Sequence, residues 1–117
     1  MTVVETKPST AWTDVCAVGD LTPDRGVAAR IGDRQVAVFV LSSGDVYALD
    51  NRDPFSGANV LCNGIVGDHC GVATVASPVY KQRFSLTTGE CIDDPTVSVS
   101  TWSTRVDEGR VLIRAAS

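Results

Sequence analysis

Short runs of β-branched and aromatic residues, separated by turn signals roughly every eight to twelve residues, dominate this sequence. Residues 26–31 and 35–41 are apolar runs that flank the tripeptide 32–34, whose glycine supplies the positive φ that a tight hairpin turn needs. A second pair of runs, 100–106 and 110–114, is separated by another turn that contains glycine. No stretch shows helical periodicity over three turns. The sequence therefore predicts an all-β fold, an antiparallel β sandwich or incomplete barrel with little or no helix.

One domain accounts for the length of the sequence. A chain of 117 residues is long enough to bury a core of its own. The first ten residues are polar, include Pro8 and show no periodicity, so residues 1–10 are predicted to form a flexible tail. Residues 11–117 are predicted to form a single β domain. One core is expected, and it should contain Trp12, Phe39, Tyr47, Trp102, Val36 and Val38.

Composition and charge exclude several classes of protein. Apolar residues make up 44% of the chain and charged residues 21%, as in an ordinary soluble domain, and the net charge is −4. This acidic balance argues against a nucleic-acid partner, since phosphate binding needs a concentrated basic face. No apolar run reaches the length of a membrane span, and residues 1–10 lack a secretory signal, so a cytoplasmic protein is predicted. The abundance of arginine, alanine and valine suggests a GC-rich bacterial genome.

Residues that could carry catalysis or bind a metal are few. The sequence contains no Gly-x-Ser-x-Gly elbow, no phosphate-binding loop and no dinucleotide fingerprint. The one histidine, His69, precedes Cys70 in a glycine-rich stretch, and these two residues with Cys62 form the only metal-like grouping. Since no Cys-x-x-Cys pair is present, we expect no metal site and a solvated His69. The cysteines are expected to be reduced or buried thiols without an assigned role: Cys16, Cys62, Cys70 and Cys91.

Residues 51–95 form an excursion from the β frame that contains two proline-marked loops. The first loop, residues 51–58, reads Asn-Arg-Asp-Pro-Phe-Ser-Gly-Ala. The second loop, residues 76–84, reads Ala-Ser-Pro-Val-Tyr-Lys-Gln-Arg-Phe, and short strands over residues 72–76 and 82–86 are expected to hold it. These two loops resemble the cluster-binding loops of a Rieske iron–sulfur domain. The resemblance implies a Rieske-like fold in which the two loops are apposed.

All four cluster-ligand positions implied by this resemblance carry other residues. A Rieske domain has Cys-x-His in the first loop and Cys-x-x-His in the second, because two thiolates hold one iron and two imidazoles hold the other. A chain with a single histidine cannot supply two imidazoles. The resemblance therefore implies a chain with no metal site, no cofactor site and no catalytic residue. The four former ligand positions are Asp53, Phe55, Ser77 and Tyr80.

The substituted residues offer the two loops another way to stay together. Phe55 and Tyr80 could place aromatic surface in the space that a cluster would occupy. Asp53 and Ser77 could form hydrogen bonds to backbone amides or to the Tyr80 hydroxyl. In the alternative interpretation, the loops are ordered turns in which these side chains have no residual role.

The tips of the two loops face the redox partner in a Rieske domain, so the resemblance also implies a docking role for them here. A mixture of aromatic and basic groups on an acidic protein suits an acidic patch on a partner. In the alternative, the aromatic side chains only fill the vacated site and the basic ones are solvated charges. The expected docking residues are Arg52, Phe55, Tyr80, Lys81 and Arg83.

Nearly the whole domain resembles one branch of this fold. The stretches 46–61, 64–68 and 75–84 are together similar to the small subunits of assimilatory NAD(P)H-dependent nitrite reductases. That resemblance implies a non-catalytic, structural or regulatory subunit of an oxidoreductase that reduces nitrite to ammonium in nitrate assimilation. The implied partner is a large subunit that carries FAD, a 4Fe-4S cluster and sirohaem.

Three other functions are compatible with a domain of this kind. The missing ligands disfavour the first, a stand-alone ferredoxin-like electron carrier. The second is an accessory domain of another oxidoreductase, such as a ring-hydroxylating oxygenase, and it would lack a neighbouring gene for a sirohaem protein. The third is a free-standing module that binds a small molecule between the loops, and it would show saturable ligand binding.

Overall fold

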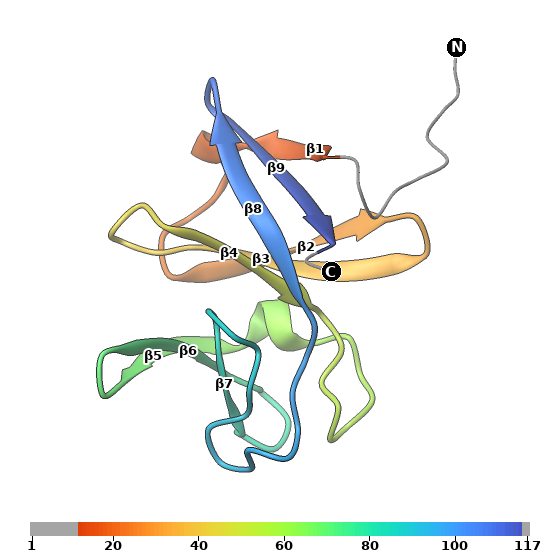
Figure 1. The fold of residues 1–117 in the computed structure, drawn as a ribbon, viewed down its shortest axis with the longest axis vertical. Helices are drawn as coiled ribbons and strands as arrows, with labels where there is room; N and C mark the ends of the chain where they lie inside the picture. The colour runs from red at the N-terminus through yellow and green to blue at the C-terminus, as the bar shows by residue number, and fades with distance from the viewer. Residues whose placement is uncertain (1–11, 116–117) are drawn as a thin grey trace.

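The computed structural model describes residues 12–115, and this part of the chain is built from antiparallel strands. Two 3-10 turns are its helical elements: η2 (Val18–Asp20) and η3 (Leu61–Asn63). The predicted all-β fold is therefore confirmed. The strands, labelled in Figure 1, are β1 (Thr13–Ala17), β2 (Arg25–Ile31), β3 (Arg34–Val40), β4 (Val46–Asp50), β5 (Ile65–His69), β6 (Val72–Ala76), β7 (Arg83–Ser85), β8 (Thr101–Asp107) and β9 (Arg110–Ala115).

The strands form two sheets that lie one above the other in Figure 1. The larger sheet has the order β1-β9-β8-β4-β3-β2 and curls into an incomplete barrel. The smaller sheet has the order β5-β6-β7. Both hairpins expected from the sequence are present, with Val27 opposite Val38 in β2–β3 and Thr104 opposite Ile113 in β8–β9. Local turn chemistry was sufficient to predict these pairs.

Strand β3 separates two hydrophobic cores, so the expectation of one core is wrong. Val36 and Val38 face the interior of the barrel, whereas Ala37 and Phe39 face the smaller sheet, and all four side chains are fully buried. A strand with both faces covered shows a continuous apolar run rather than an alternating one, and residues 36–40 have that pattern. Trp12 belongs to neither core; its ring lies beneath Arg114 at 4.5 Å.

Two local expectations are also corrected. Residues 65–69, which resembled a glycine-rich loop, form strand β5 because they pair with β6 from Ile65–Ala76 to His69–Val72. In residues 97–100, serines alternate with valines, which is typical of a strand with one solvent-exposed face. These residues contain only an isolated bridge at Ser98, and strand β8 begins at Thr101. The predicted tail, residues 1–10, lies outside the described residues. Within residues 12–115, no helix is long and apolar enough to cross a membrane.

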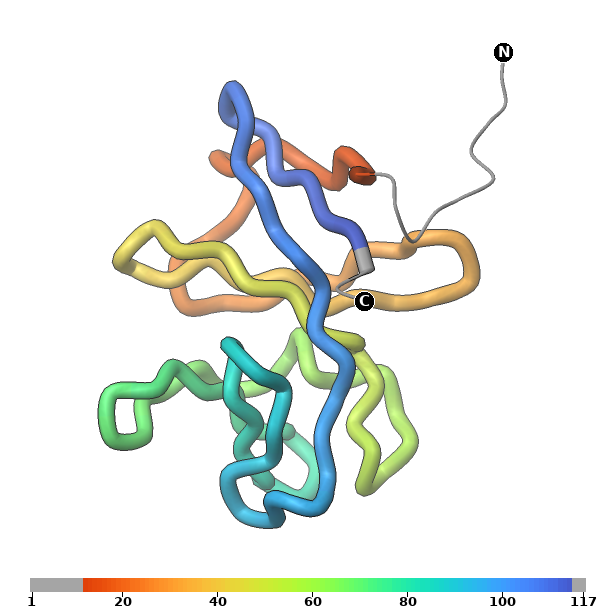
Figure 2. The backbone as a smooth tube through the Cα atoms, viewed as in Figure 1, coloured from red at the N-terminus to blue at the C-terminus, as the bar shows by residue number. Residues whose placement is uncertain are grey.

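The excursion between β4 and β8 gathers the two proline-marked loops at one end of the molecule. Figure 2 shows the first loop, in yellow-green, descending from the end of β4. The chain then passes through the smaller sheet and returns past the same end, in blue, to β8. The backbone hydrogen bond from the N–H of Leu61 to the carbonyl of Asn51 closes the base of the first loop at 3.0 Å. The loops are thus carried on a closed frame of strands.

Candidate functional site

The first loop is a closed turn stabilised by Asp53. The backbone N–H of Asp53 donates to the Ala58 carbonyl at 2.8 Å, and the N–H of Gly57 donates to the Asp53 carbonyl at 2.7 Å. The carboxylate oxygen Oδ1 of Asp53 accepts the N–H of Phe55 at 2.8 Å, as aspartates do in tight turns. Gly57 has a φ of +77°, a conformation that favours glycine. These bonds orient the Asp53 side chain inward.

The second loop closes through Ser77 in the same manner. The N–H of Ser77 donates to the Gln82 carbonyl at 2.9 Å, and the N–H of Lys81 donates to the Ser77 carbonyl at 3.0 Å. The Ser77 hydroxyl oxygen also accepts the N–H of Val79 at 3.2 Å. Lys81 has a φ of +67°, which places it at the bend of the loop. Residues 78–81 therefore project from a loop whose two ends are joined.

Asp53 and Ser77 join the two loops directly. The Ser77 hydroxyl donates to Oδ2 of Asp53 at 2.5 Å, and both residues are buried, at 1% and 0% exposure. Burial by itself raises the pKa of the Asp53 carboxyl, but hydrogen bonds from Ser77, Phe55 and Ser56 outweigh it and lower that pKa below its ordinary value. The carboxylate is thus charged and held by donors from both loops. We call this contact the Asp53–Ser77 bridge.

The aromatic residues at the former ligand positions do not form the expected pair. Phe55 is half-buried and packs against Phe84 of β7, with ring centroids 6.2 Å apart and an interplanar angle of 46°. Tyr80 is 59% exposed. Its ring therefore does not fill the space between the loops, because the backbone of the second loop turns it outward. Phe55 alone ties the first loop to the core between the two sheets.

The four former ligand positions offer a different set of donors from those of a 2Fe-2S site. A Rieske cluster needs two thiolates and two imidazoles, whereas these positions carry a bridged carboxylate, a packed phenyl ring, a hydroxyl group and an exposed phenol. The residues present do not fit that cluster. In the part of the chain that the structure describes, no three His, Cys, Asp or Glu side chains lie close enough together to hold a metal ion.

Arg83, one of the residues predicted to dock, forms an ion pair with Asp93. Its guanidinium Nη2 lies 2.8 Å from Oδ1 of Asp93, and its backbone N–H donates to Oδ2 at 2.9 Å. Hydrogen bonding from Arg83 lowers the pKa of the Asp93 carboxyl. Nη1 of Arg83 also lies 3.3 Å from Nδ1 of His69, which the sequence placed in a solvated loop. Pairing of β5 with β6 brings this histidine, half-buried, beside β7.

Of the basic residues predicted to dock, Lys81 and Arg52 remain available. Both are exposed, and neither makes an ion pair with another residue in the range 12–115. Val79, at 44% exposure, and Tyr80 stand beside Lys81 on the second loop. Exposed tyrosines are enriched in protein–protein interfaces, and a neighbouring unpaired lysine can pair with an acidic group at the rim of such an interface. We call residues 79–81 the tip patch.

The cysteines occupy separate parts of the fold, and all four are free thiols. Cys91 is buried in the core between the sheets, whereas Cys70 is exposed at the turn between β5 and β6. Burial raises the pKa of the Cys16 thiol in β1, and nearby Asp20 raises it further. Cys62 lies in η3, half-buried. The structure gives the cysteines no shared site.

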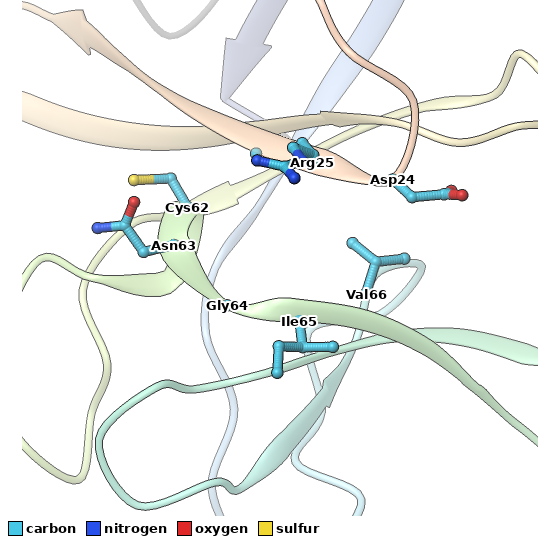
Figure 3. A pocket seen from close by; sticks show the side chains of 8 residues that line it. Asp24, Arg25, Cys62, Asn63, Gly64, Ile65 and Val66 are labelled. Carbon is cyan, nitrogen blue, oxygen red and sulfur yellow. The ribbon is translucent and has the colours of Figure 1, made fainter.

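A cavity of about 410 Å³ lies between the start of β2 and the start of β5, away from the two loops. Figure 3 shows Val66 pointing toward Asp24, whereas Ile65 points to the opposite side of its strand. The Cys62 and Asn63 side chains point away from Val66. Polar groups therefore do not converge on one ligand position, as they do in small-molecule sites. In the alternative of a small-molecule module, the ligand would lie between the two loops, where the structure brings Asp53 and Ser77 into contact.

Comparisons with known proteins agree with the class that this fold and its paired loops define, a Rieske-like domain. The family model of the Rieske-like 2Fe-2S domain matches residues 11–114. The ferredoxin of carbazole 1,9a-dioxygenase from Nocardioides aromaticivorans has the same fold, with a TM-score of 0.78 at 21% identity over 91% of this chain and 99% of that one.

A narrower group within this class is much more similar in sequence. The NADH nitrite reductase small subunit of Escherichia coli is 43% identical over 104 residues, which is 88% of this chain and 96% of that one. A Mycobacterium tuberculosis protein, proposed to be an NADH-dependent nitrite reductase small subunit, has a crystal structure that matches with a TM-score of 0.87 at 50% identity, over 92% and 97% of the two chains. This chain belongs to the family of Rieske-like small subunits of NAD(P)H-dependent nitrite reductases.

One relative is a much longer protein. The NAD(P)H nitrite reductase large subunit of Klebsiella oxytoca contains a segment that is 41% identical to this chain over 106 residues. The match covers 91% of this chain and 11% of the longer one. A domain like this one is therefore part of a large-subunit polypeptide in that organism.

Proposed function

We propose that this chain is a clusterless, structural or regulatory subunit that binds the large subunit of a cytoplasmic NAD(P)H-dependent nitrite reductase. The large subunit would carry FAD, a 4Fe-4S cluster and sirohaem, and would reduce nitrite to ammonium in nitrate assimilation. This chain would contribute no catalytic group. The single observation that carries the proposal is the Asp53–Ser77 bridge, which joins the loops of a nitrite reductase small subunit through a hydrogen bond where a Rieske domain uses metal.

The proposal that this chain holds no cluster is supported by how each former ligand position is used. Both carboxylate oxygens of Asp53 accept hydrogen bonds, one from each loop. The Ser77 hydroxyl donates to Asp53 and accepts the N–H of Val79. Phe55 is committed to packing against Phe84. Reorganising these contacts to admit a cluster would break buried hydrogen bonds, each of which costs roughly 1–3 kcal/mol when one partner is left unsatisfied.

The relative in Klebsiella oxytoca supports the choice of partner. There, a segment like this chain is covalently part of a polypeptide named as a nitrite reductase large subunit. A fused domain is held at high effective concentration beside the rest of its chain. We infer that this chain makes the corresponding contact with a large subunit.

The tip patch is the proposed contact surface on this chain. Tyr80 and Val79 would enter a recess on the large subunit, and Lys81 would face a carboxylate there. Arg52 on the first loop would add a second cation to the same surface. The sequence also predicted Phe55 and Arg83 as docking residues. In this proposal they stabilise the loops instead, Phe55 by packing against Phe84 and Arg83 through its ion pair with Asp93.

Binding between this chain and the purified large subunit tests the proposal. We expect Lys81→Glu to weaken the affinity roughly tenfold, because an attractive contact becomes a repulsive one. Arg83 is unsuitable for this test because its reversal would break the ion pair with Asp93. The matched control is Arg25→Glu, an exposed cation at the start of β2 that should leave the affinity within about twofold. Failure of the wild-type chain to bind the large subunit would overturn the proposed function.

A second function has weaker support. Ferredoxins of carbazole 1,9a-dioxygenase share the fold, and one of them, 25% identical to this chain, is seen in complex with its oxygenase. An accessory role in such an oxygenase would use the same end of the domain. The much higher identity to nitrite reductase small subunits favours the first proposal.

A further inference from the structure

A second cavity, of about 310 Å³, lies beside the first loop and is lined by an unusual number of arginines for so acidic a protein. Arg30 comes from β2, Arg34 from the start of β3, and Arg52 from the first loop. Asp33 and Asp50 also line the cavity. The β2–β3 hairpin and the first loop therefore bring guanidinium groups to one place.

Arg34 and Asp50 neutralise each other and form a fixed wall of this cavity. Nη2 of Arg34 lies 2.8 Å from both carboxylate oxygens of Asp50. The indole Nε1 of Trp102 donates to Oδ1 of Asp50 at 2.8 Å, and the Arg34 guanidinium lies over the Trp102 ring, 5.2 Å from its centroid. Because its carboxylate is bound in this way, Asp50 does not neutralise the positive charges of Arg30 and Arg52.

Arg30 and Arg52 are the cations left without an acidic partner. Neither makes an ion pair within residues 12–115, and the hydrogen bond of the Arg30 side chain goes to the Gly32 carbonyl at 3.3 Å. Asp33 is exposed at the turn and, like them, is in no ion pair of the described chain. One carboxylate thus faces two free guanidinium groups, and the cavity has an excess of positive charge.

Gln35 and Asn59 also line the cavity. Nδ2 of Asn51 donates to Oε1 of Gln35 and to the Asn59 carbonyl, both at 3.2 Å. The first of these bonds holds the Gln35 amide oxygen against Asn51, and the Gln35 amide nitrogen is able to donate to a ligand in the cavity. A set of guanidinium and amide donors is complementary to a carboxylate or a phosphate.

We infer that this cavity is an anion subsite that receives an aspartate or glutamate side chain of the large subunit. The inference rests on the proposed function and extends its contact surface. Arg52 belongs both to the cavity and to the first loop, and the Asp53–Ser77 bridge joins that loop to the second loop, which carries the tip patch. The net charge of −4 repels an acidic surface of the partner from the other parts of this chain. The partner's acidic surface is thereby directed toward the arginine-lined cavity.

Charge reversal at Arg30 tests the subsite separately from the tip patch. The affinity of the full chain for the purified large subunit is expected to fall about tenfold with Arg30→Glu and about threefold with the neutral Arg30→Gln. Arg25→Glu makes the same charge change on the same strand, outside the cavity, and should change the affinity less than about twofold. Raising the salt concentration should shrink the Arg30→Glu effect. Thermal midpoints of all variants identify any that are misfolded, and Arg30→Gln retains a test if Arg30→Glu fails to fold.

The outcomes separate the subsite from the proposed function. If Arg30→Glu binds like Arg25→Glu while Lys81→Glu binds weakly, the subsite is wrong and docking by the tip patch stands. If Arg25→Glu weakens binding as much as Arg30→Glu, the effect is one of net charge and the subsite is again wrong. Saturable binding of inorganic phosphate that Arg30→Glu abolishes, with unchanged affinity for the large subunit, would assign the cavity to a free anion and overturn the inference. A wild-type chain that does not bind the large subunit would refute both.

Discussion

Asp53 and Ser77 stand at the positions where a Rieske domain carries its two thiolates, and here they bond to each other across the loops. The bridge has a direct link to the proposed docking surface, because the Ser77 hydroxyl also accepts the N–H of Val79 in the tip patch. A buried carboxylate with donors from two loops can hold them in register without metal. At the scale of single residues, this bridge is the part of the site on which the rest depends.

Removal of the Ser77 hydroxyl should therefore destabilise the fold. Ser77→Ala leaves one oxygen of the buried Asp53 carboxylate without its donor, which we expect to lower the free energy of unfolding by roughly 1–3 kcal/mol. Ser98→Ala, at an exposed position, is the control and should stay within about 0.5 kcal/mol of wild type. Urea unfolding measures both variants. Equal stability of the two would show that the bridge contributes nothing to folding.

The same bridge predicts how stability depends on pH. The pKa of Asp53 lies below its ordinary value of 3.8 in the folded protein, so the unfolded chain binds this proton more readily than the folded one does. The stabilisation is complete above the unfolded pKa and is lost as the pH falls through the folded pKa. Asp53→Asn should be less stable than wild type at neutral pH, and this difference should shrink as the solution is acidified. Stability curves that stay parallel down to low pH would contradict the assignment.

At the scale of elements, the return path from β7 to β8 is secured by close backbone contact. Gly89 has a φ of +80°, and its carbonyl accepts the N–H of Val99 at 2.9 Å. A Cβ added at Gly89 would meet the Val99 carbonyl oxygen, whereas at Gly109, with a φ of +78°, it would meet nothing within 4 Å. The two glycines thus share a backbone conformation but differ in the space around them.

This difference gives a matched pair of variants. Gly109→Ala should cost roughly 1–2 kcal/mol of stability, the cost of placing a side chain in the left-handed region. Gly89→Ala should cost that amount and a further 1–3 kcal/mol, roughly, because the two backbones must separate. Thermal unfolding of the two variants gives the comparison. A Gly89→Ala variant no less stable than Gly109→Ala would show that the backbone between β7 and β8 shifts to admit the added methyl group without a loss of stability.

Elements set by local sequence could be predicted, and elements set by distant partners could not. The β2–β3 and β8–β9 hairpins follow from their own turns and apolar runs. Strand β5 has a glycine at its centre and owes its conformation to pairing with β6, so it resembled a loop. The ion pair of Arg83 with Asp93 joins residues that only the fold brings together, so it was not predicted from the sequence.

At the scale of the whole molecule, the domain has a Rieske-like fold, and the proposed use of its loop end is docking on a partner. The class and the position of the loops were predictable from the resemblance of their sequences to Rieske loops. The outward position of Tyr80 was not, because it depends on the conformation of the second loop, in which Lys81 has a positive φ. The arginine cavity was also not predictable, since it is assembled from β2, β3 and the first loop.

The central claim is that the two loops hold together without a cluster. Its most direct test is anaerobic incubation of the purified chain with iron and sulfide, removal of unbound metal, and EPR spectroscopy of the dithionite-reduced sample together with iron and sulfide analysis. We expect the isolated chain, from a preparation shown to be able to bind the large subunit, to be colourless, with no stoichiometric iron and no Rieske-type signal. Two irons per chain with a Rieske-type signal would contradict the account.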